Sequence, residues 1–417
     1  MSMIFNKFSL HQPTNIDPNS ALISVIIGSL CALIFLLINP FLALFLVAVM
    51  SLYFRVPRLI FFFFATLSFS MLFVRREYGI DWYPESSDDV PAYVNIYFSN
   101  LDLSFFDLWN RFLEAPSGNE ILWHIPWHII LNEFGVGENT FIFLHYIANF
   151  LMLFISMRLL SQRYWIALIL VYFFMTPLTL VGIAHIWRQH LAICLFISGV
   201  ALKYQHKSRA GEWLIYMSIF VHISLVFFIF LYWLFLILRK NLIFDSKSSF
   251  IFWISILMAF IPLLSSIAIT ILDSLGAARI MGYYETGNGS SIRVFLLLIG
   301  YMLPMLVVFL KYQTDEINQL FLLLNLAVFS IVLALPSANG IYDRLLMFTL
   351  PLMGIYFYRC LICNGSGRWL APALAIIFCI GSYRMYIPTI ENTGVMSFIG
   401  NGYAFDPFMG LVNMLVN

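Results

Sequence analysis

The sequence has very little charge. Only 10% of its 417 residues are Asp, Glu, Lys or Arg, whereas 62% are hydrophobic. Soluble domains carry roughly 25% charged residues, so this composition excludes a water-soluble fold. The formal net charge is +1 at pH 7, which excludes the strongly basic surface that attracts nucleic acid. No nucleic-acid partner is therefore expected.

Cysteine is also scarce, and its placement suggests neither a disulfide framework nor a metal site. Cys31, Cys194 and Cys379 lie inside apolar runs, where a thiol acts as a small hydrophobic group. Cys360 and Cys363 have the spacing of metal ligands, but no second pair and no nearby histidine accompany them.

What the sequence contains instead is a series of apolar runs long enough to cross a bilayer. A helix of about 20 apolar residues spans the hydrocarbon core and satisfies its own backbone groups there. The runs predict an all-α, polytopic integral membrane helical bundle, with residues 1–417 forming a single transmembrane domain. The expected spans lie at about residues 20–38, 41–54, 58–74, 140–157, 164–181, 186–202, 249–272, 292–310, 317–335, 341–358 and 369–387.

Two further apolar segments are ambiguous in length. Residues 121–134 are long enough only for a re-entrant or interfacial helix. Residues 212–238 are too long for one upright span and short for two. We therefore expect residues 212–238 to form a hairpin of half-helices that is broken near His222.

The basic residues then settle the orientation. With this arrangement they fall on one face, Arg359 among them, which identifies that face as cytoplasmic. The opposite, extracytoplasmic face receives two loops, at residues 75–120 and 273–291. The first loop continues into the re-entrant or interfacial helix that ends at about residue 134. Because the unusual polar residues collect on this face, the active surface is expected to be extracytoplasmic.

Arg188 is the most informative of these polar residues, because it lies in the first half of an apolar run. An arginine at the centre of a membrane helix costs about 2.5–3.5 kcal/mol, so it needs an anionic partner or an aqueous cavity. One interpretation is a structural ion pair with a carboxylate. The other is a clamp for a diphosphate at a helix N-terminus, because a guanidinium makes bidentate contacts that a lysine cannot. His185 lies on the same helical face, and Gln189 is adjacent.

Three other arginines and one histidine are further candidates. Arg344 follows Asp343 near the outer boundary, so it is either a snorkelling residue with a local partner or a substrate contact. Arg279 and Arg293 flank a glycine-bearing loop that could cover a bound substrate. His222 lies in an apolar segment at the expected helix break, either as a packed core histidine or as part of a cavity.

Common catalytic motifs are absent. The chain has no Gly-rich phosphate loop, no HExxH, no GxSxG and no Asp-x-Asp pair near the expected outer face. A cytosolic enzyme that uses sugar nucleotides usually has a metal-binding carboxylate pair or a soluble domain. Any sugar donor is therefore expected to arrive through the membrane and to bind without a metal.

At these residues the chain resembles the EpsG-like family of bacterial polysaccharide polymerases, relatives of the Wzy-type O-antigen polymerases. The matching motifs occur in the family's order: Arg75-Arg76-Glu77-Tyr78-Gly79-Ile80-Asp81, Glu120, Arg188-Gln189-His190-Leu191-Ala192, His222-Ile223-Ser224-Leu225 and Arg344. The segment WYPESSDDVPA, which contains Asp89, separates Asp81 from Tyr93. Either aspartate could therefore occupy the family position.

The resemblance implies a membrane glycosyltransferase of GT-C-like architecture with about 11–14 spans. Its implied reaction is the polymerisation of undecaprenyl-diphosphate-linked oligosaccharide units on the outer side of the inner membrane, without a cofactor or metal. The implied partners are the lipid-linked oligosaccharide, membrane lipids and a separate chain-length regulator. Two alternatives stay open: an O-antigen ligase-type transferase, and a flippase or transporter for the lipid-linked sugar.

Each candidate residue has an expected role in that reaction. The expected diphosphate-binding residues are Arg76, Arg188, Arg279 and Arg344. The expected catalytic residues are Asp81, Glu120 and His222, and the sequence does not rank the carboxylates. Other residues expected in the pocket are Asp89, Tyr93, His185 and Gln189.

Overall fold

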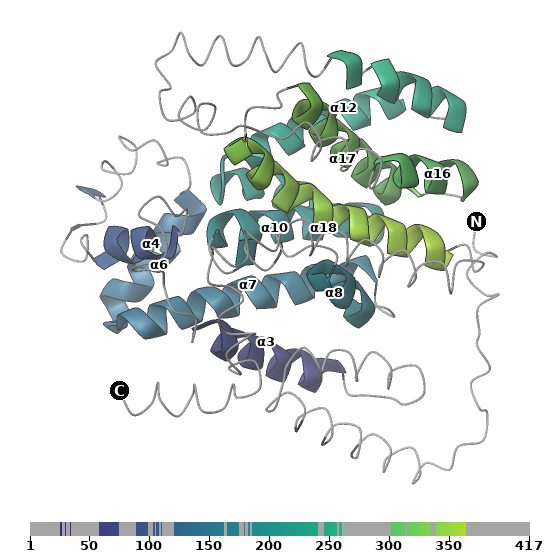
Figure 1. The fold of residues 1–417 in the computed structure, drawn as a ribbon. Coiled ribbons are helices and arrows are strands. Elements are labelled where there is room, and N and C mark those ends of the chain that lie inside the picture. The colour runs from purple at the N-terminus through teal and green to yellow at the C-terminus, as the bar shows by residue number, and fades with distance from the viewer. Residues whose placement is uncertain are drawn as a thin grey trace.

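The structure is a computed structural model, and the residues that it describes are mostly helical (Figure 1). The described ranges are 58–74, 89–98, 121–161, 165–174, 186–240, 246–256, 258–260, 302–312, 315–334 and 339–363. Isolated described positions are 26, 30, 34, 103, 104, 106, 107, 110, 179, 182 and 183. Every regular element within these residues is a helix, which confirms the all-α class.

The helices follow the apolar runs of the sequence. Their bounds are α3 Arg58–Val74, α4 Asp89–Phe98, α6 Ile121–Phe134, α7 Glu138–Leu160, α8 Trp165–Phe174, α10 Trp187–Tyr204, α11 Ala210–Met217, η2 Ser218–Phe220, α12 Leu225–Lys240, α16 Leu303–Lys311, α17 Glu316–Ala334 and α18 Asn339–Cys363. Residues 247–256 and 258–260 are also helical. A helix is present over 121–134, as expected, while its placement at the membrane interface stays a prediction.

Aromatic packing holds the first helices around α7, which lies between α3, α8 and α10 (Figure 1). The rings of Phe69 on α3 and Phe173 on α8 stack with their centroids 5.3 Å apart. The ring of Phe150 on α7 also lies 5.3 Å from Phe69. Such pairs contribute about 0.5–1.5 kcal/mol each beyond the burial of area, so they join three helices that are distant in the sequence.

Two glycines let α10 and α11 approach closely. A Cβ atom on Gly199 would lie 2.7 Å from the carbonyl oxygen of Gly211, and a Cβ on Gly211 would lie 2.5 Å from that of Gly199. Real Cβ atoms do not approach a backbone oxygen so closely. Small residues at such crossings allow the backbone contact that drives helix association in membranes.

α7 is the one helix, within the ranges above, that is both long and apolar enough to cross a membrane, with 23 residues. Shorter apolar helical stretches include Phe62–Met71, Glu316–Ile331 and Leu345–Cys360. The total number of spans and the GT-C-like architecture therefore stay predictions.

The segment around His222 is a broken hairpin. α11 and η2 lead into a turn at 221–224, and α12 follows it. The indole Nε1–H of Trp233 on α12 donates a hydrogen bond to the hydroxyl of Tyr216 on α11, at 3.0 Å. The two half-helices therefore lie against each other, and the helix break is where the sequence predicts it.

The outer face of α12 exposes a single apolar stripe. Val226, Phe230, Trp233 and Ile237 are 46–56% exposed, and their spacing places them on one side of the helix. Bulky apolar side chains exposed in a continuous row are typical of a surface that faces hydrocarbon. The stripe supports a membrane location for this hairpin.

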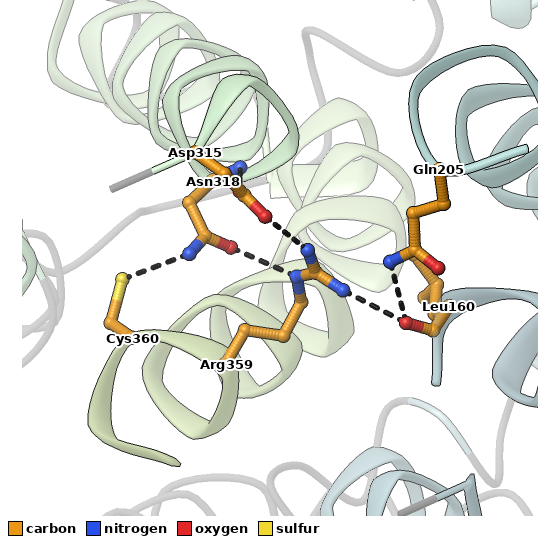
Figure 2. A network of polar contacts seen from close by, with 6 residues as sticks. All are labelled: Leu160, Gln205, Asp315, Asn318, Arg359 and Cys360. Atoms are coloured by element: carbon orange, nitrogen blue, oxygen red, sulfur yellow. Dashed lines mark hydrogen bonds and ion pairs between the residues drawn. The ribbon is translucent and has the colours of Figure 1, made fainter. Parts of the chain in front are cut away.

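At one end of the bundle, charged and polar residues join four helices around Arg359 (Figure 2). Its guanidinium donates to Asp315 Oδ2 at 2.5 Å, to Asn318 Oδ1 at 3.1 Å and to the carbonyl oxygen of Leu160 at 2.9 Å. The side-chain amide of Gln205 donates to the same Leu160 oxygen at 2.6 Å. We call this group the Arg359 network; it ties the last residues of α7 and α10 to α17 and α18.

Two further ion pairs belong to the helix ends near this network. Lys203 near the end of α10 pairs with Glu212 on α11, and Arg239 near the end of α12 pairs with Glu316 at the start of α17. Basic residues that the sequence assigns to one face therefore do gather at one end of the bundle. That this end is the cytoplasmic one stays a prediction.

Candidate functional site

Arg188 occupies the first turn of α10, at the opposite end of that helix from the Arg359 network. The helix begins at Trp187, and its N-cap residue Ile186 makes no side-chain hydrogen bond to the helix. The first turn contains no acidic residue. With a rise of about 1.5 Å per residue, Arg188 lies about 25 Å along the helix from Gln205. A half-buried cation thus adds to the positive end of a helix dipole, and this arrangement favours an anion.

The aromatic ring of Tyr93 contacts the guanidinium of Arg188. The Cζ atom of Arg188 lies 4.7 Å from the centroid of the Tyr93 ring, and Tyr93 is buried in α4. A cation–π contact of this kind is worth about 0.5–2 kcal/mol. The contact brings α4, which Asp89 opens, to the first turn of α10.

Behind this contact lies an aromatic cluster, which we define as Tyr93, Trp123, Trp127, His145 and Trp187. The imidazole of His145 is sandwiched between two indoles: its centroid is 3.6 Å from that of Trp127 and 4.7 Å from that of Trp187. Trp123 lies 4.8 Å from His145, and Tyr93 lies 5.6 Å from Trp187. The aromatic cluster joins α4, α6 and α7 to the residue that precedes Arg188.

α6 is also fixed by His128, which follows Trp127. His128 forms a hydrogen bond with the backbone of Leu103, and its burial lowers the pKa of the imidazole below the usual value of 6.5. The desolvation that lowers this pKa outweighs the backbone hydrogen bond, which raises it. His128 is thus neutral near pH 7 and tethers α6 without adding charge to the site.

A line of polar side chains fixes α10 against α7 below the cluster. The Nδ1–H of His190 on α10 donates to Asn149 Oδ1 on α7 at 2.8 Å, and the Asn149 amide donates to the carbonyl oxygen of His145 at 3.0 Å. Farther along, Ser156 Oγ donates to the carbonyl oxygen of Cys194 at 2.7 Å. His190 therefore packs inside the bundle, and these bonds set the position of α10 and hence of Arg188.

Gln189 lines a small pocket between α8, α10 and α18. The cavity volume is only about 10 Å³, and its wall includes Tyr172, Thr179, His190 and Met347. Gln189 is 2% exposed. Gln189 thus lies inside the bundle beside the first turns of α10, and its place in a substrate pocket stays a prediction.

His222 lies in the turn between η2 and α12, where it is 9% exposed. The backbone N–H of Ser224 donates to His222 Nδ1 at 3.3 Å, and the Ser224 hydroxyl lies 2.6 Å from the same nitrogen. Since a backbone N–H only donates, Nδ1 must carry a lone pair, and the neutral ring then carries its proton on Nε2. This tautomer suits a hydrogen-bond donor better than a base.

The other candidate residues fall wholly or partly outside the part of the chain that the structure describes. Asp81, Glu120, Arg76, Arg279 and His185 lie outside the described residues. Asp89 and Arg344 lie on the described helices α4 and α18, but their side chains do not belong to the described part. Of the predicted residues, the structure brings Arg188 and Tyr93 into contact. No three His, Cys, Asp or Glu side chains of the described ranges form a group that could hold a metal ion.

Sequence reasoning assigned no role to Trp123, Trp127, His145 and Trp187. A signal was present, since Trp123 and Trp127, like Phe141 and His145, are four residues apart and share a helix face. The convergence of three helices on His145 is not visible in any one of these local patterns.

The chain matches the model of the EpsG family over residues 58–399. No curated protein and no solved structure matches it. The matched range contains α3 to α18 and all the candidate residues named above. The chain therefore belongs to the EpsG family, a family of Wzy-like polymerase type.

Proposed function

We propose that this protein is a membrane-embedded glycosyltransferase that polymerises undecaprenyl-diphosphate-linked oligosaccharide units. The observation that carries the proposal is the place of Arg188, a half-buried guanidinium in the first turn of α10, in a chain of the EpsG family. A diphosphate would meet both the guanidinium and the unsatisfied N–H groups of the helix start. Two charge-assisted contacts from one planar group also fix the orientation of the diphosphate.

In the proposed reaction, a hydroxyl of the acceptor sugar attacks the anomeric carbon of the growing chain. The new glycosidic C–O bond forms while the C–O bond to the lipid diphosphate breaks. Undecaprenyl diphosphate leaves with the electron pair, and the hydroxyl proton passes to a base. Negative charge grows on the departing oxygen, so a preorganised guanidinium stabilises the transition state more than the ground state.

The base is proposed to be a carboxylate, from Asp81, Asp89 or Glu120. A partly desolvated carboxylate can acquire the basicity needed to accept the hydroxyl proton. The contacts of His222 support this preference, because its Nδ1 lone pair is directed to Ser224.

The proposed reaction takes place at the extracytoplasmic side of the inner membrane. The support is the separation of charge along α10: Arg188 begins the helix, and the Arg359 network with its neighbouring basic residues lies at the other end. Positive residues favour the cytoplasmic side of membrane proteins, which would leave Arg188 facing outward.

The test is polymer formation by the purified protein in detergent, with undecaprenyl-diphosphate-linked oligosaccharide as the only substrate. Wild-type protein is expected to yield a ladder of chain lengths and one released undecaprenyl diphosphate for each bond formed. Arg188→Lys is expected to reduce the rate about 10²–10³-fold, the usual effect of losing one preorganised charge-stabilising contact. Arg158→Lys is the matched control, because Arg158 is an exposed arginine near the other end of α7.

The products separate the proposal from its rivals. Transfer of finished polysaccharide to another lipid acceptor, with no chain growth, would identify a ligase. Movement of the intact lipid-linked unit across liposomes, with no bond formed, would identify a transporter. A normal ladder from Arg188→Lys would refute the bidentate contact to diphosphate.

A further inference from the structure

Three buried polar atoms of the aromatic cluster have no hydrogen-bond partner among the residues that the structure describes. They are the Nε1–H groups of Trp123 and Trp187 and the Nε2 atom of His145. Each of the three side chains is at most 1% exposed. Buried polar atoms are nearly always paired, so a group of three without partners calls for a specific explanation.

The three atoms belong to neighbouring rings. The centroid of His145 lies 4.8 Å from that of Trp123 and 4.7 Å from that of Trp187. His145 Nδ1 lies 2.9 Å from the carbonyl oxygen of Phe141. A carbonyl only accepts, so Nδ1 carries the proton and Nε2 keeps its lone pair. The cluster therefore contains two hydrogen-bond donors and one hydrogen-bond acceptor among the faces of aromatic rings.

This set of groups discriminates between chemical classes of ligand. A phosphate oxygen accepts hydrogen bonds and cannot satisfy the lone pair of His145 Nε2. An acyl chain would satisfy none of the three atoms. Sugar hydroxyls both donate and accept, and the C–H faces of a sugar ring pack on aromatic rings. Sugar is the class of ligand that can engage both the polar atoms and the faces of the rings.

The cluster also adjoins the proposed diphosphate contact. Tyr93 carries the Arg188 guanidinium over its ring at 4.7 Å, and the same ring lies 5.6 Å from Trp187 and 6.2 Å from Trp123. Resting on the proposed function, we infer that Trp123, His145 and Trp187 form the subsite for a sugar carried close to the diphosphate of the lipid-linked substrate. The rings of Trp127 and His145 stack with their centroids 3.6 Å apart, so the inference requires α6, which carries Trp123 and Trp127, to move away from His145 when the sugar binds.

Phenylalanine substitutions test this subsite, because they keep an aromatic ring in place and remove the unpaired polar atoms. His145→Phe also removes the Nδ1 hydrogen bond to Phe141. The variants are Trp123→Phe, His145→Phe and Trp187→Phe. Each is expected to raise the KM for the lipid-linked oligosaccharide about 3- to 10-fold, the usual effect of losing one neutral hydrogen bond, with kcat little changed. Melting temperatures measure the packing cost separately, because a tryptophan-to-phenylalanine change also removes ring volume from the core. Trp165→Phe is the control: Trp165 is equally buried, on α8, and its KM should not change.

An unchanged KM in all three variants would overturn the inference and leave the polymerase proposal intact. The same conclusion would follow if a single bound water joined the three atoms in an experimental structure and KM were unaffected. If the wild-type protein made no polymer, calorimetric titration with the oligosaccharide released from its lipid would still test whether the sugar subsite exists. Binding by wild type that is weakened in Trp187→Phe supports the subsite, and no binding by wild type rejects it.

Discussion

The guanidinium of Arg188 on α10 lies over the ring of Tyr93 on α4, with 4.7 Å from Cζ to the ring centroid. The face of the ring presents the negative part of its quadrupole to the cation. A positioned arginine of this kind can be stacked and can still make the bidentate contacts that a diphosphate requires. Tyr93 is thus expected to set the orientation of Arg188 rather than its charge.

Substitutions at Tyr93 should separate the ring from its hydroxyl. Tyr93→Phe retains the cation–π face and is expected to keep most polymerase activity. Tyr93→Leu loses the face and should lower kcat/KM for the lipid-linked oligosaccharide about 5- to 30-fold, which corresponds to about 1–2 kcal/mol. Steady-state kinetics of the purified variants give this measurement. Equal activity of the Phe and Leu variants would show that the ring face does not orient Arg188.

The pair formed by Asn149 and His190 should behave as a buried polar unit. Asn149→Leu leaves the Nδ1–H of His190 without its acceptor, at a cost of about 1–3 kcal/mol. The double variant Asn149→Leu/His190→Leu removes both partners and should recover much of this loss. Thermal melting in detergent measures the difference. A double variant that is as unstable as the sum of the two single variants would mean that the hydrogen bond itself contributes little.

The sequence predicts the local features of this site well. Arg188 falls in the first turn of a helix, and the hairpin breaks at His222, because both follow from hydropathy, length and the distribution of charge along one segment. The aromatic cluster could not be predicted in the same way. Its centre, His145, receives rings from α6 and α10, and no local pattern specifies which helices meet.

Arg359, at the other end of the bundle, shows the same difference between what the sequence predicts and what depends on tertiary packing. The distribution of basic residues predicts only that Arg359 lies on the charged face. In the structure its side chain is 9% exposed and reaches three different acceptors. The acceptors come from the end of α7 and the start of α17, so their convergence depends on tertiary packing.

The crossing of α10 and α11 should not tolerate a side chain at Gly199. In Gly199→Ala the new Cβ would approach both Gly211 O and the backbone nitrogen of Ile215, within 2.7–2.8 Å. Both neighbours are backbone atoms, so α11 must move, and the yield of folded protein after detergent extraction should fall severely. Gly137→Ala is the control, because a Cβ there meets nothing within 4 Å. Normal yield and melting temperature for Gly199→Ala would show that the two helices can separate without cost.

Arg359 should matter for stability and not for the recognition of substrate. Arg359→Met removes three hydrogen bonds from a nearly buried side chain and leaves Asn318 Oδ1 without this donor. The Asp315 side chain is 48% exposed, so the cost comes mainly from the buried contacts to Asn318 and Leu160, about 1–3 kcal/mol. The melting temperature in detergent should therefore fall by several degrees. The KM of the protein that remains folded should match wild type, because the network lies about 25 Å along α10 from Arg188. Arg158→Met, at an exposed position, controls for the loss of a positive charge from the same end of the bundle. An increase in KM without a change in melting temperature would contradict this structural role of Arg359. It would mean that a change at one end of α10 alters substrate binding at the other end.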